Sequence, residues 1–246
     1  MNEQQKNLNK PLQSKGYQIR PSIKQPKSVA IIGGGIASAC VAYALTKKDI
    51  KVTLYCKDKE VAQGASSNHA GALFPLIHQQ KDDISLFYQQ AFWHALTCYK
   101  DLYSKGFNFS HDWCGLLEIS YKAALEKRQN TFQQSSPWPK ELITSVNTEK
   151  ASELAGITLQ HGGLFMPNAG WIAPAELVQQ LFLASEKTEL LTIKNQVSVT
   201  KINQQPDNSW QLETNIGSIN EALVIFCGGA ESIKLNIIDE LPLSSV

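Results

Sequence analysis

The sequence lacks an apolar run of the length that a membrane-spanning helix needs, and its amino terminus has no apolar core of the signal-peptide kind. Its five cysteines show neither the paired spacing of a metal site nor the framework of a disulfide-rich domain. We therefore expect no membrane association, no metal, and a reducing cytoplasm as the compartment. The net charge is only +1, so the chain as a whole does not have the composition of a polyanion-binding protein.

Basic charge is concentrated at the amino terminus. Residues 1–28 carry six basic side chains and one acidic side chain, a charge of +5 that leaves −4 for the remainder. This segment is rich in Gln, Asn, Lys and Pro and poor in apolar residues, which predicts a flexible basic arm. Such an arm can contact RNA or an acidic membrane surface, but most arms of this kind are linkers or solubilising tails.

The most informative segment is a glycine-rich turn at residues 29–38. Four apolar residues, Val29–Ile32, lead into the glycines at 33–35, and a helical pattern and a second apolar strand at 52–56 follow. This order is typical of a βαβ unit whose first turn binds a dinucleotide. Glycine lets the backbone approach a pyrophosphate closely, and the following helix N-terminus offers N–H groups and positive potential to the anion.

The glycine fingerprint is nearly complete. Gly33 and Gly35 occupy its first two positions, and Ser38 stands where the third small residue belongs. No acidic residue ends the second strand to bind the ribose, because Cys56 occupies that position. Either Asp58 reaches the ribose from the following loop, or backbone and water hold it. At this point NAD and FAD are both open, as is a glycine turn without a ligand.

Apolar periodicity predicts the remaining elements. Helices are expected at 82–105, 122–134, 148–155 and 174–185, and strands at 116–120, 162–167, 197–202, 209–214 and 222–226. Asp82 or Asp83 is the expected cap of the first helix, Thr148 that of the third, and Pro174 opens the fourth. The last strand ends in Gly228-Gly229, and a flavin-type dinucleotide domain closes its sheet with such a hairpin and final strand.

Four segments together resemble the D-amino-acid-oxidase-like family of FAD-dependent oxidoreductases. They are 29–38, 52–56, 64–75 and 224–230, and the resemblance extends from residue 29 to the C-terminus. Within that family the chain is most similar to a subgroup that modifies the wobble uridine of tRNA, in which a cysteine replaces the acidic residue, as Cys56 does here. The further motifs that carry this similarity are Gly163-Leu164-Phe165, Gly170-Trp171 and Pro174-Ala175-Glu176-Leu177.

The resemblance implies an α/β fold in which a Rossmann-like FAD-binding domain is interleaved with a smaller α+β substrate domain of mixed sheet. After the arm, we expect the first part of the FAD-binding domain at 29–80, the substrate domain at 81–172, and the second part of the FAD-binding domain at 173–246. Family members continue beyond this point with the arginine that is expected to bind the substrate carboxylate. The fold is therefore expected to be incomplete at the C-terminus.

The resemblance also assigns cofactor-binding roles by matching position. The turn and the first helical residues are expected to hold the pyrophosphate, a loop of small residues to line the flavin side, one hairpin residue to face the adenine, and one late glycine to pass close to the cofactor. The residues expected at the pyrophosphate are Gly33, Gly35, Ile36, Ala37 and Ser38. Those expected on the flavin side are Ala65, Ser66 and Asn68, the one facing the adenine is Val199, and the late glycine is Gly229. For Ser66 and Asn68 a purely structural role in capping the loop stays open.

The activity that the resemblance implies is an FAD-dependent oxidation of a CH–NH donor. In the subgroup, the carboxymethyl arm of carboxymethylaminomethyl-uridine or its 2-thio form at tRNA position 34 is removed, which leaves the aminomethyl uridine for a methyltransferase. Expected partners are tRNA and either a separate methyltransferase or the missing C-terminal half. Neither Arg20 nor Arg128 matches the carboxylate-binding position, so no catalytic residue is named. A glycine-oxidase-like amine or amino-acid oxidase and a truncated FAD- or RNA-binding fragment without turnover stay open as alternatives.

Overall fold

The structure is a computed structural model that describes residues 26–229. These residues form two compact units. The parallel-sheet unit takes residues 26–71, Gly106–Ser110 and 173–229, and the inserted unit takes Ala72–Lys105 and His111–Ile172. The two units meet in the chain between 71 and 72 and between 172 and 173, and the domain bounds expected from the sequence stay a prediction. Most of the predicted arm lies outside the described residues.

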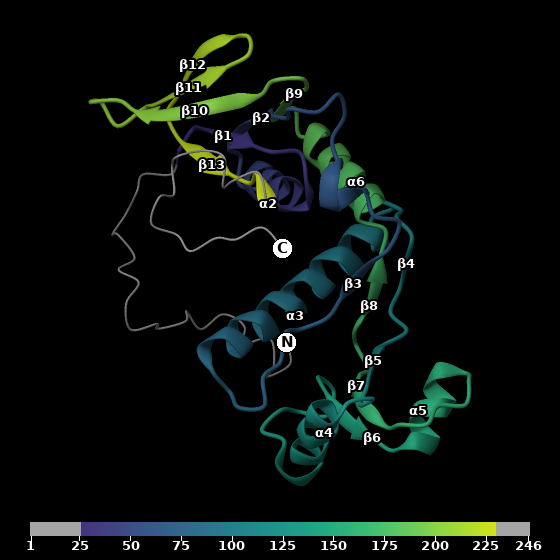
Figure 1. Ribbon diagram of the computed structural model, residues 1–246. Coiled ribbons are helices and arrows are strands. Elements are labelled where there is room, and N and C mark those ends of the chain that lie inside the picture. Colours follow the sequence, from purple (N-terminus) through teal and green to yellow (C-terminus); the bar gives the residue numbers. More distant parts are fainter. Residues whose placement is uncertain (1–25, 230–246) are drawn as a thin grey trace. The chain divides into compact units, whose positions relative to one another are not determined.

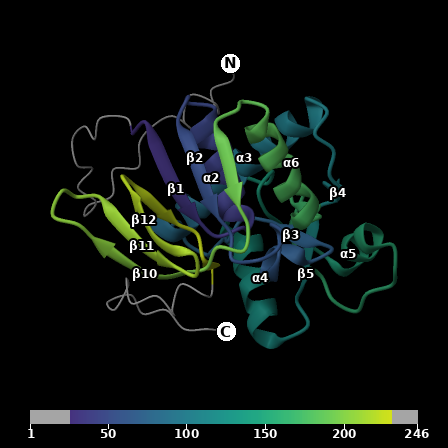
Figure 2. The ribbon, with the colours of Figure 1, turned by 90° about the horizontal axis from the view of Figure 1, so that it is seen from above.

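A four-stranded parallel sheet organises the parallel-sheet unit (Figures 1 and 2), with the strand order β13-β1-β2-β9. Its inner strand β1 is apolar on both faces, and Ala30 and Ile31 have no exposed surface. Strands of this kind are typical of parallel sheets that are covered on both sides. The four strands are β1 (Ser28–Ile32), β2 (Lys51–Tyr55), β9 (Leu191–Lys194) and β13 (Val224–Phe226).

Two helices pack against each other in this unit. The glycine turn leads into α2 (Ile36–Thr46), which packs on α6 (Pro174–Glu186). Because Ala39 and Ala42 are small and fully buried, the two helix backbones can approach closely. Pro174 is the first residue of α6, as predicted, where its missing N–H removes no helical hydrogen bond.

A three-stranded antiparallel sheet packs on the parallel sheet through one apolar cluster. Ile32 and Tyr55 of the parallel sheet and Leu212 of the antiparallel sheet are buried in this cluster. The sequence predicted only a hairpin here, because Ile219 is the sole large apolar residue of the third strand. The strands, in sheet order, are β10 (Val199–Gln204), β11 (Trp210–Thr214) and β12 (Gly217–Glu221).

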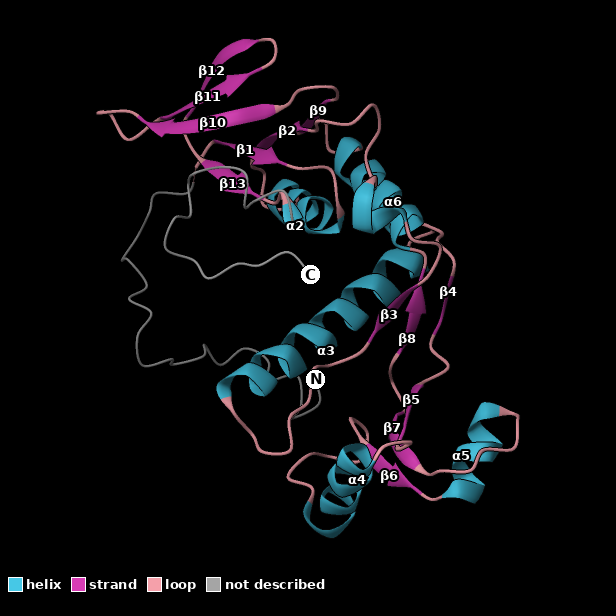
Figure 3. Ribbon diagram, in the orientation of Figure 1, coloured by secondary structure: helices cyan, strands magenta, loops and turns pink. Residues whose placement is uncertain are grey.

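The inserted unit combines helices with two small sheets (Figure 3). Its core gathers Phe92 and Leu96 of α3, Phe132 of α4, and Leu164 and Met166 of β7. The helices are α3 (Asp83–Ser104), α4 (Ala123–Ser135) and α5 (Thr148–Ala155). One sheet has the order β3 (Gly71–Leu73), β8 (Gly170–Ile172) and β4 (His111–Asp112), and the other has the order β5 (Leu116–Ile119), β7 (Gly163–Met166) and β6 (Thr144–Val146).

Helix caps resolve one prediction and correct another. Asp82 caps α3, because its carboxylate accepts a hydrogen bond of 2.8 Å from the backbone N–H of Ser85. The prediction that Thr148 caps α5 is wrong, because Thr148 is already helical. Asn147 has the extended backbone of an N-cap, and its side chain accepts from the N–H of Lys150 at 2.9 Å. Neighbouring residues of similar capping propensity cannot be separated by composition alone.

Candidate functional site

The first glycine of the turn lies against the end of β13. Gly33 donates its N–H to the carbonyl of Tyr55 at 2.9 Å, which fixes the turn to the end of β2. Its φ is +123°, and a Cβ at this position would lie 2.4 Å from the carbonyl oxygen of Cys227. Both the left-handed backbone and the close approach therefore require glycine here.

The second glycine faces the thiol that ends β2. A Cβ on Gly34 would lie 2.5 Å from the Cys56 Sγ. Burial raises the pKa of the Cys56 thiol above its usual value, and a backbone hydrogen bond from Asp58 opposes that rise in part. Ala62 donates its N–H to the Gly34 carbonyl at 2.8 Å, so the loop after β2 folds back on the turn. Cys56 thus fills the space in front of the turn, where the sequence led us to look for a ribose-binding acid.

The third glycine opens the N-terminus of α2. Gly35 is the N-cap and supplies no capping side chain, and the first turn of the helix contains no acidic residue. The N–H of Ile36 donates to the Ser66 Oγ at 3.1 Å, and a Cβ on Gly35 would lie 3.1 Å from that same oxygen. Ser66, in the short 3₁₀ helix Gly64–Ser67, therefore brings a hydroxyl to the positive end of a helix.

Ser38 has a packing role at this site. Its side chain is fully buried, and within the described range 26–229 its Oγ has no regular hydrogen-bond partner. Burial raises the pKa of the Cys227 thiol, and the nearby Ser38 hydroxyl opposes that rise in part. A Cβ on Gly33 would lie 3.1 Å from the Ser38 Oγ. The small third residue of the fingerprint thus allows α2 to pack closely on the turn.

Hydrogen bonds and close contacts bring together most of the predicted pyrophosphate-binding residues. The set is Gly33, Gly35, Ile36 and Ser38, with Ala37 following in the first turn of α2, and Ser66, which was predicted for the flavin side, contacts the start of that helix. Gly229 follows Cys227 after β13 and has a φ of +58°.

Three predicted residues lie apart from these contacts. Ala65 and Asn68 are exposed in the loop around the 3₁₀ helix, and Val199 begins β10, packed against the apolar cluster. Cys227, whose carbonyl sets the limit on residue 33, was not predicted as a site residue. The sequence signal that could have identified Cys227 is its position directly before Gly228-Gly229.

These residues fit a dinucleotide. The turn offers backbone without side chains, the helix N-terminus offers N–H groups, and the first turn of α2 contributes no carboxylate to repel a pyrophosphate. No group of three or more His, Cys, Asp or Glu side chains within residues 26–229 is arranged to hold a metal ion. None of the helices in that range is long and apolar enough to span a membrane.

Fold and site together define a dinucleotide-binding α/β protein with the glycine turn between β1 and α2. The particular family follows from the sequence: the family model described as FAD dependent oxidoreductase (DAO) matches residues 28–245, and the chain belongs to that family. This confirms the predicted family and α/β fold, and it identifies FAD, rather than NAD, as the cofactor.

Curated relatives share a name that refers to tRNA. The chain is 35% identical over 240 residues to the tRNA 5-methylaminomethyl-2-thiouridine biosynthesis bifunctional protein MnmC of Pseudoalteromonas atlantica, a match over 90% of this chain and 34% of the relative. The protein of the same name from Shewanella halifaxensis is 32% identical over 205 residues, which cover 83% of this chain and 32% of the relative. The chain thus spans about a third of the length of these relatives.

Solved structures confirm the fold. Glycine oxidase from Geobacillus kaustophilus aligns with a TM-score of 0.70 at 19% identity, over 84% of this chain and 56% of that one. Glycine oxidase from Bacillus cereus aligns with a TM-score of 0.71 at 21% identity, over 85% of this chain and 57% of that one. At these identities the likeness concerns the fold.

Proposed function

We propose that this chain is the flavin-binding part of an oxidoreductase that modifies the wobble uridine of tRNA, removing the carboxymethyl group from carboxymethylaminomethyl-uridine or its 2-thio form. The observation that carries the proposal is the glycine turn with the Ser66 hydroxyl at the start of α2, in a chain that is 35% identical to a protein named for tRNA 2-thiouridine biosynthesis. The turn supports the cofactor site, and the relative's name, which refers to tRNA and to 2-thiouridine, supports a tRNA uridine as the substrate.

In this proposal the residues of the turn act through their backbone. Gly33, Gly35 and the N–H groups of Ile36 and Ala37 bind the pyrophosphate, with the Ile36 N–H shared between the pyrophosphate and the Ser66 hydroxyl, and Ser38 packs beneath them. The other candidates keep their expected roles: Ala65, Ser66 and Asn68 line the flavin side, Val199 presents its backbone to the adenine, and Gly229 passes close to the cofactor.

The chemistry that bound FAD supplies is acceptance of a hydride from the carbon next to the substrate nitrogen. The substrate loses that hydride and the amine proton, which leaves an imine in the N–CH2–COO⁻ arm. Water adds to the imine carbon and the carbon–nitrogen bond breaks, so that glyoxylate and the aminomethyl uridine are released. This chain's task is to orient the arm and to hold the cofactor rigidly while it does so.

Two partners complete the proposal. tRNA is the substrate, and either a separate methyltransferase or a further segment carrying the rest of the substrate domain acts with this chain. A cytoplasmic location fits both partners, because tRNA modification takes place there.

Flavin reduction by defined substrates tests the proposal. The purified chain is loaded with FAD, and its absorbance is followed without oxygen during addition of tRNA bearing carboxymethylaminomethyl-uridine. Bleaching by this tRNA, and not by tRNA with unmodified uridine 34, is the expected result. Bleaching by free glycine or sarcosine alone would favour the glycine-oxidase-like alternative, and FAD binding without reduction by any of them would favour a binding module.

Substitution of Ser66 tests the cofactor site itself. In Ser66→Ala the hydroxyl that fixes the Gly64–Ser67 segment to the N–H of Ile36 is lost, so this segment is held less firmly against the start of α2 and we expect weaker FAD binding. Ser67→Ala is the matched control, because the Ser67 hydroxyl donates to the Gly64 carbonyl of its own loop. Equal FAD affinity in both variants would contradict the role given to Ser66.

A further inference from the structure

A pocket of about 340 Å³ lies wholly within the inserted unit. The segment 74–79 forms much of its lining, together with Glu118 of β5, Arg128 of α4 and Met166 of β7. Phe74 and Leu76 are 44% and 43% exposed, so their apolar side chains are accessible to a ligand. A volume of this size is in the range of small-molecule sites, and its lining combines apolar walls with one pair of charged groups.

Hydrogen bonds hold the wall of this pocket in place. The carbonyl of Ile77 accepts from the Arg128 Nη2 at 3.0 Å, and the carbonyl of His78 accepts from the indole N–H of Trp138 at 2.9 Å. The N–H of His78 donates to the hydroxyl of Ser85 at 2.9 Å, which ties the segment to the first turn of α3. The pocket is therefore built before a ligand arrives, so binding would order little of the chain.

The charged pair in the lining has no net charge. Arg128 donates to the carboxylate of Glu118, and its guanidinium lies 5.5 Å from the centre of the Phe132 ring. The two side chains are 26% and 32% exposed. Because the guanidinium already serves a carboxylate and a carbonyl, it is poorly suited to neutralise a second carboxylate. The pair instead presents further N–H donors beside a second acceptor oxygen.

The Arg128 N–H donor and the Glu118 acceptor oxygen together suit an uncharged ligand group that offers an acceptor to Arg128 and a donor to Glu118. The imide edge of a uracil ring has this order, since its N3–H donates and the adjacent carbonyl oxygens accept. The faces of such a ring suit apolar walls such as those of Phe74, Leu76 and Met166. A glycine-type substrate has a charged carboxylate and no ring, and it would leave these walls without contact.

We propose that this pocket binds the uracil ring of the substrate uridine, with Glu118 accepting from N3–H and Arg128 donating to the neighbouring carbonyl oxygen. The proposal rests on the tRNA function proposed above, and it assigns Glu118 and Arg128 as specificity-determining residues. It requires no group beyond this chain's own side chains.

The two methionines of the chain make a direct measurement possible. In protein labelled with ¹³C at the methionine methyl groups, Met166 reports on the pocket and Met1 serves as the internal reference, with Met166→Leu assigning the signals. Uridine is the probe. We expect a saturable shift of the Met166 signal with uridine, and about tenfold weaker binding of N3-methyluridine, which lacks the donor. Equal binding of the two nucleosides, or no shift with uridine, would overturn the proposal.

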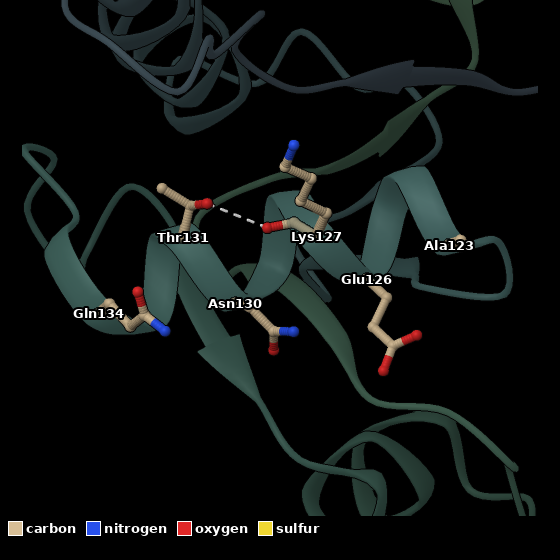
Figure 4. A pocket seen from close by; sticks show the side chains of 6 residues that line it. All are labelled: Ala123, Glu126, Lys127, Asn130, Thr131 and Gln134. Carbon is tan, nitrogen blue, oxygen red and sulfur yellow. Dashed lines mark hydrogen bonds between the residues drawn. The ribbon is translucent and has the colours of Figure 1, made fainter.

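Variants separate recognition from folding. Glu118→Gln and Arg128→Lys are each expected to weaken uridine binding about fivefold to tenfold. The first replaces a charged acceptor by a neutral one, and the second replaces a forked donor by a single ammonium group. Lys127→Gln is the control: Lys127 lies on the same helix but lines a separate polar hollow of α4 (Figure 4), so uridine affinity should not change. The wild-type comparison of uridine with N3-methyluridine decides the matter even if a variant fails to fold.

This test and the flavin test fail independently. If carboxymethylaminomethyl tRNA bleaches the flavin while uridine leaves Met166 unshifted, the pocket assignment is wrong and the proposed function stands. If uridine binds with the expected preference while no tRNA reduces the flavin, the pocket assignment stands and the proposed function is wrong for this chain.

Discussion

The phenol of Tyr55, at the end of β2, donates a hydrogen bond of 2.5 Å to a carboxylate oxygen of Glu221, at the end of β12. The ring is 1% exposed, and the ammonium of Lys194 on β9 lies 5.5 Å from its centre. One aromatic side chain thus connects the parallel sheet with the antiparallel sheet that packs on it. Burial raises the pKa of the Tyr55 phenol well above its usual range, and the hydrogen bond to Glu221 raises it further.

Removal of this hydroxyl tests its contribution to stability. We expect Tyr55→Phe to lower the free energy of unfolding by about 1–2 kcal/mol, because a hydrogen bond to a charged acceptor is lost while the ring stays packed. Urea unfolding of Tyr55→Phe, Glu221→Gln and the double variant measures the coupling. Additive effects would mean that the two groups do not interact in solution.

Since the raised pKa favours the neutral phenol, the same pair stabilises the fold fully below pH 10 and loses that contribution as the pH rises further. In wild type, stability should therefore fall more steeply above pH 10 than in Tyr55→Phe.

The glycine turn offers a matched pair of substitutions. Gly33→Ala introduces a Cβ 2.4 Å from a backbone carbonyl at a φ of +123°. Gly217→Ala introduces one at a φ of +113°, with no atom of residues 26–229 within 4 Å. We expect Gly217→Ala to cost about 1–2 kcal/mol from backbone strain alone. Gly33→Ala should cost clearly more and also weaken FAD binding. Similar thermal unfolding of both variants would show that the close approach to Cys227 is not needed.

Cysteine reactivity should follow exposure and pKa. Cys56 is 1% exposed, and burial raises the pKa of its thiol, whereas Cys114 is exposed. In the native protein, iodoacetamide should therefore modify Cys114 first and Cys56 last, since the thiolate is the reactive form. Peptide mass spectrometry over time measures both rates, with urea-unfolded protein as the control. Early alkylation of Cys56 would show that the loop over Gly34 opens readily.

Asp82 links pH to the start of α3. The hydrogen bond with the His78 ring at 2.6 Å, and after it the N–H of Ser85, lowers the pKa of the Asp82 carboxyl to about 2. A lowered pKa means that Asp82 stabilises the fold above the unfolded value of about 4 and loses this effect as the pH falls towards 2. We expect Asp82→Ala to reduce stability at pH 7 and to differ less from wild type near pH 2. Thermal unfolding at both pH values checks this expectation.

Local signals in the sequence predicted much of the site. The apolar run before the glycines and the small residues after them predict β1, the turn and α2, because each depends on neighbours within a few residues. Pro174 likewise marks the start of α6. The strand order β13-β1-β2-β9 was not predicted. The strand β9 is only four residues long, and a local sequence pattern does not indicate which strand pairs with which.

The features that the sequence did not predict are contacts between segments that lie far apart in the chain. The Tyr55–Glu221 hydrogen bond and the Ser66 hydroxyl on the N–H of Ile36 join residues that are far apart in the chain. Propensity and periodicity describe one element at a time, so they predict that a residue is buried or polar but not what it meets. The pocket around Glu118 and Arg128 was missed for the same reason, since its lining comes from four separate segments.

The pairing of β1 with β13 has a consequence for synthesis on the ribosome. Ala30 pairs with Val224, and the whole inserted unit lies between them in the chain. During translation β1 therefore emerges with one apolar edge unpaired, and that edge stays unpaired until β13 is made, while the inserted unit is synthesised and can fold. A bare edge of this kind can pair with another nascent chain. The first residue of the glycine turn lies against Cys227, directly after β13, so the dinucleotide site is complete only once the parallel sheet has closed.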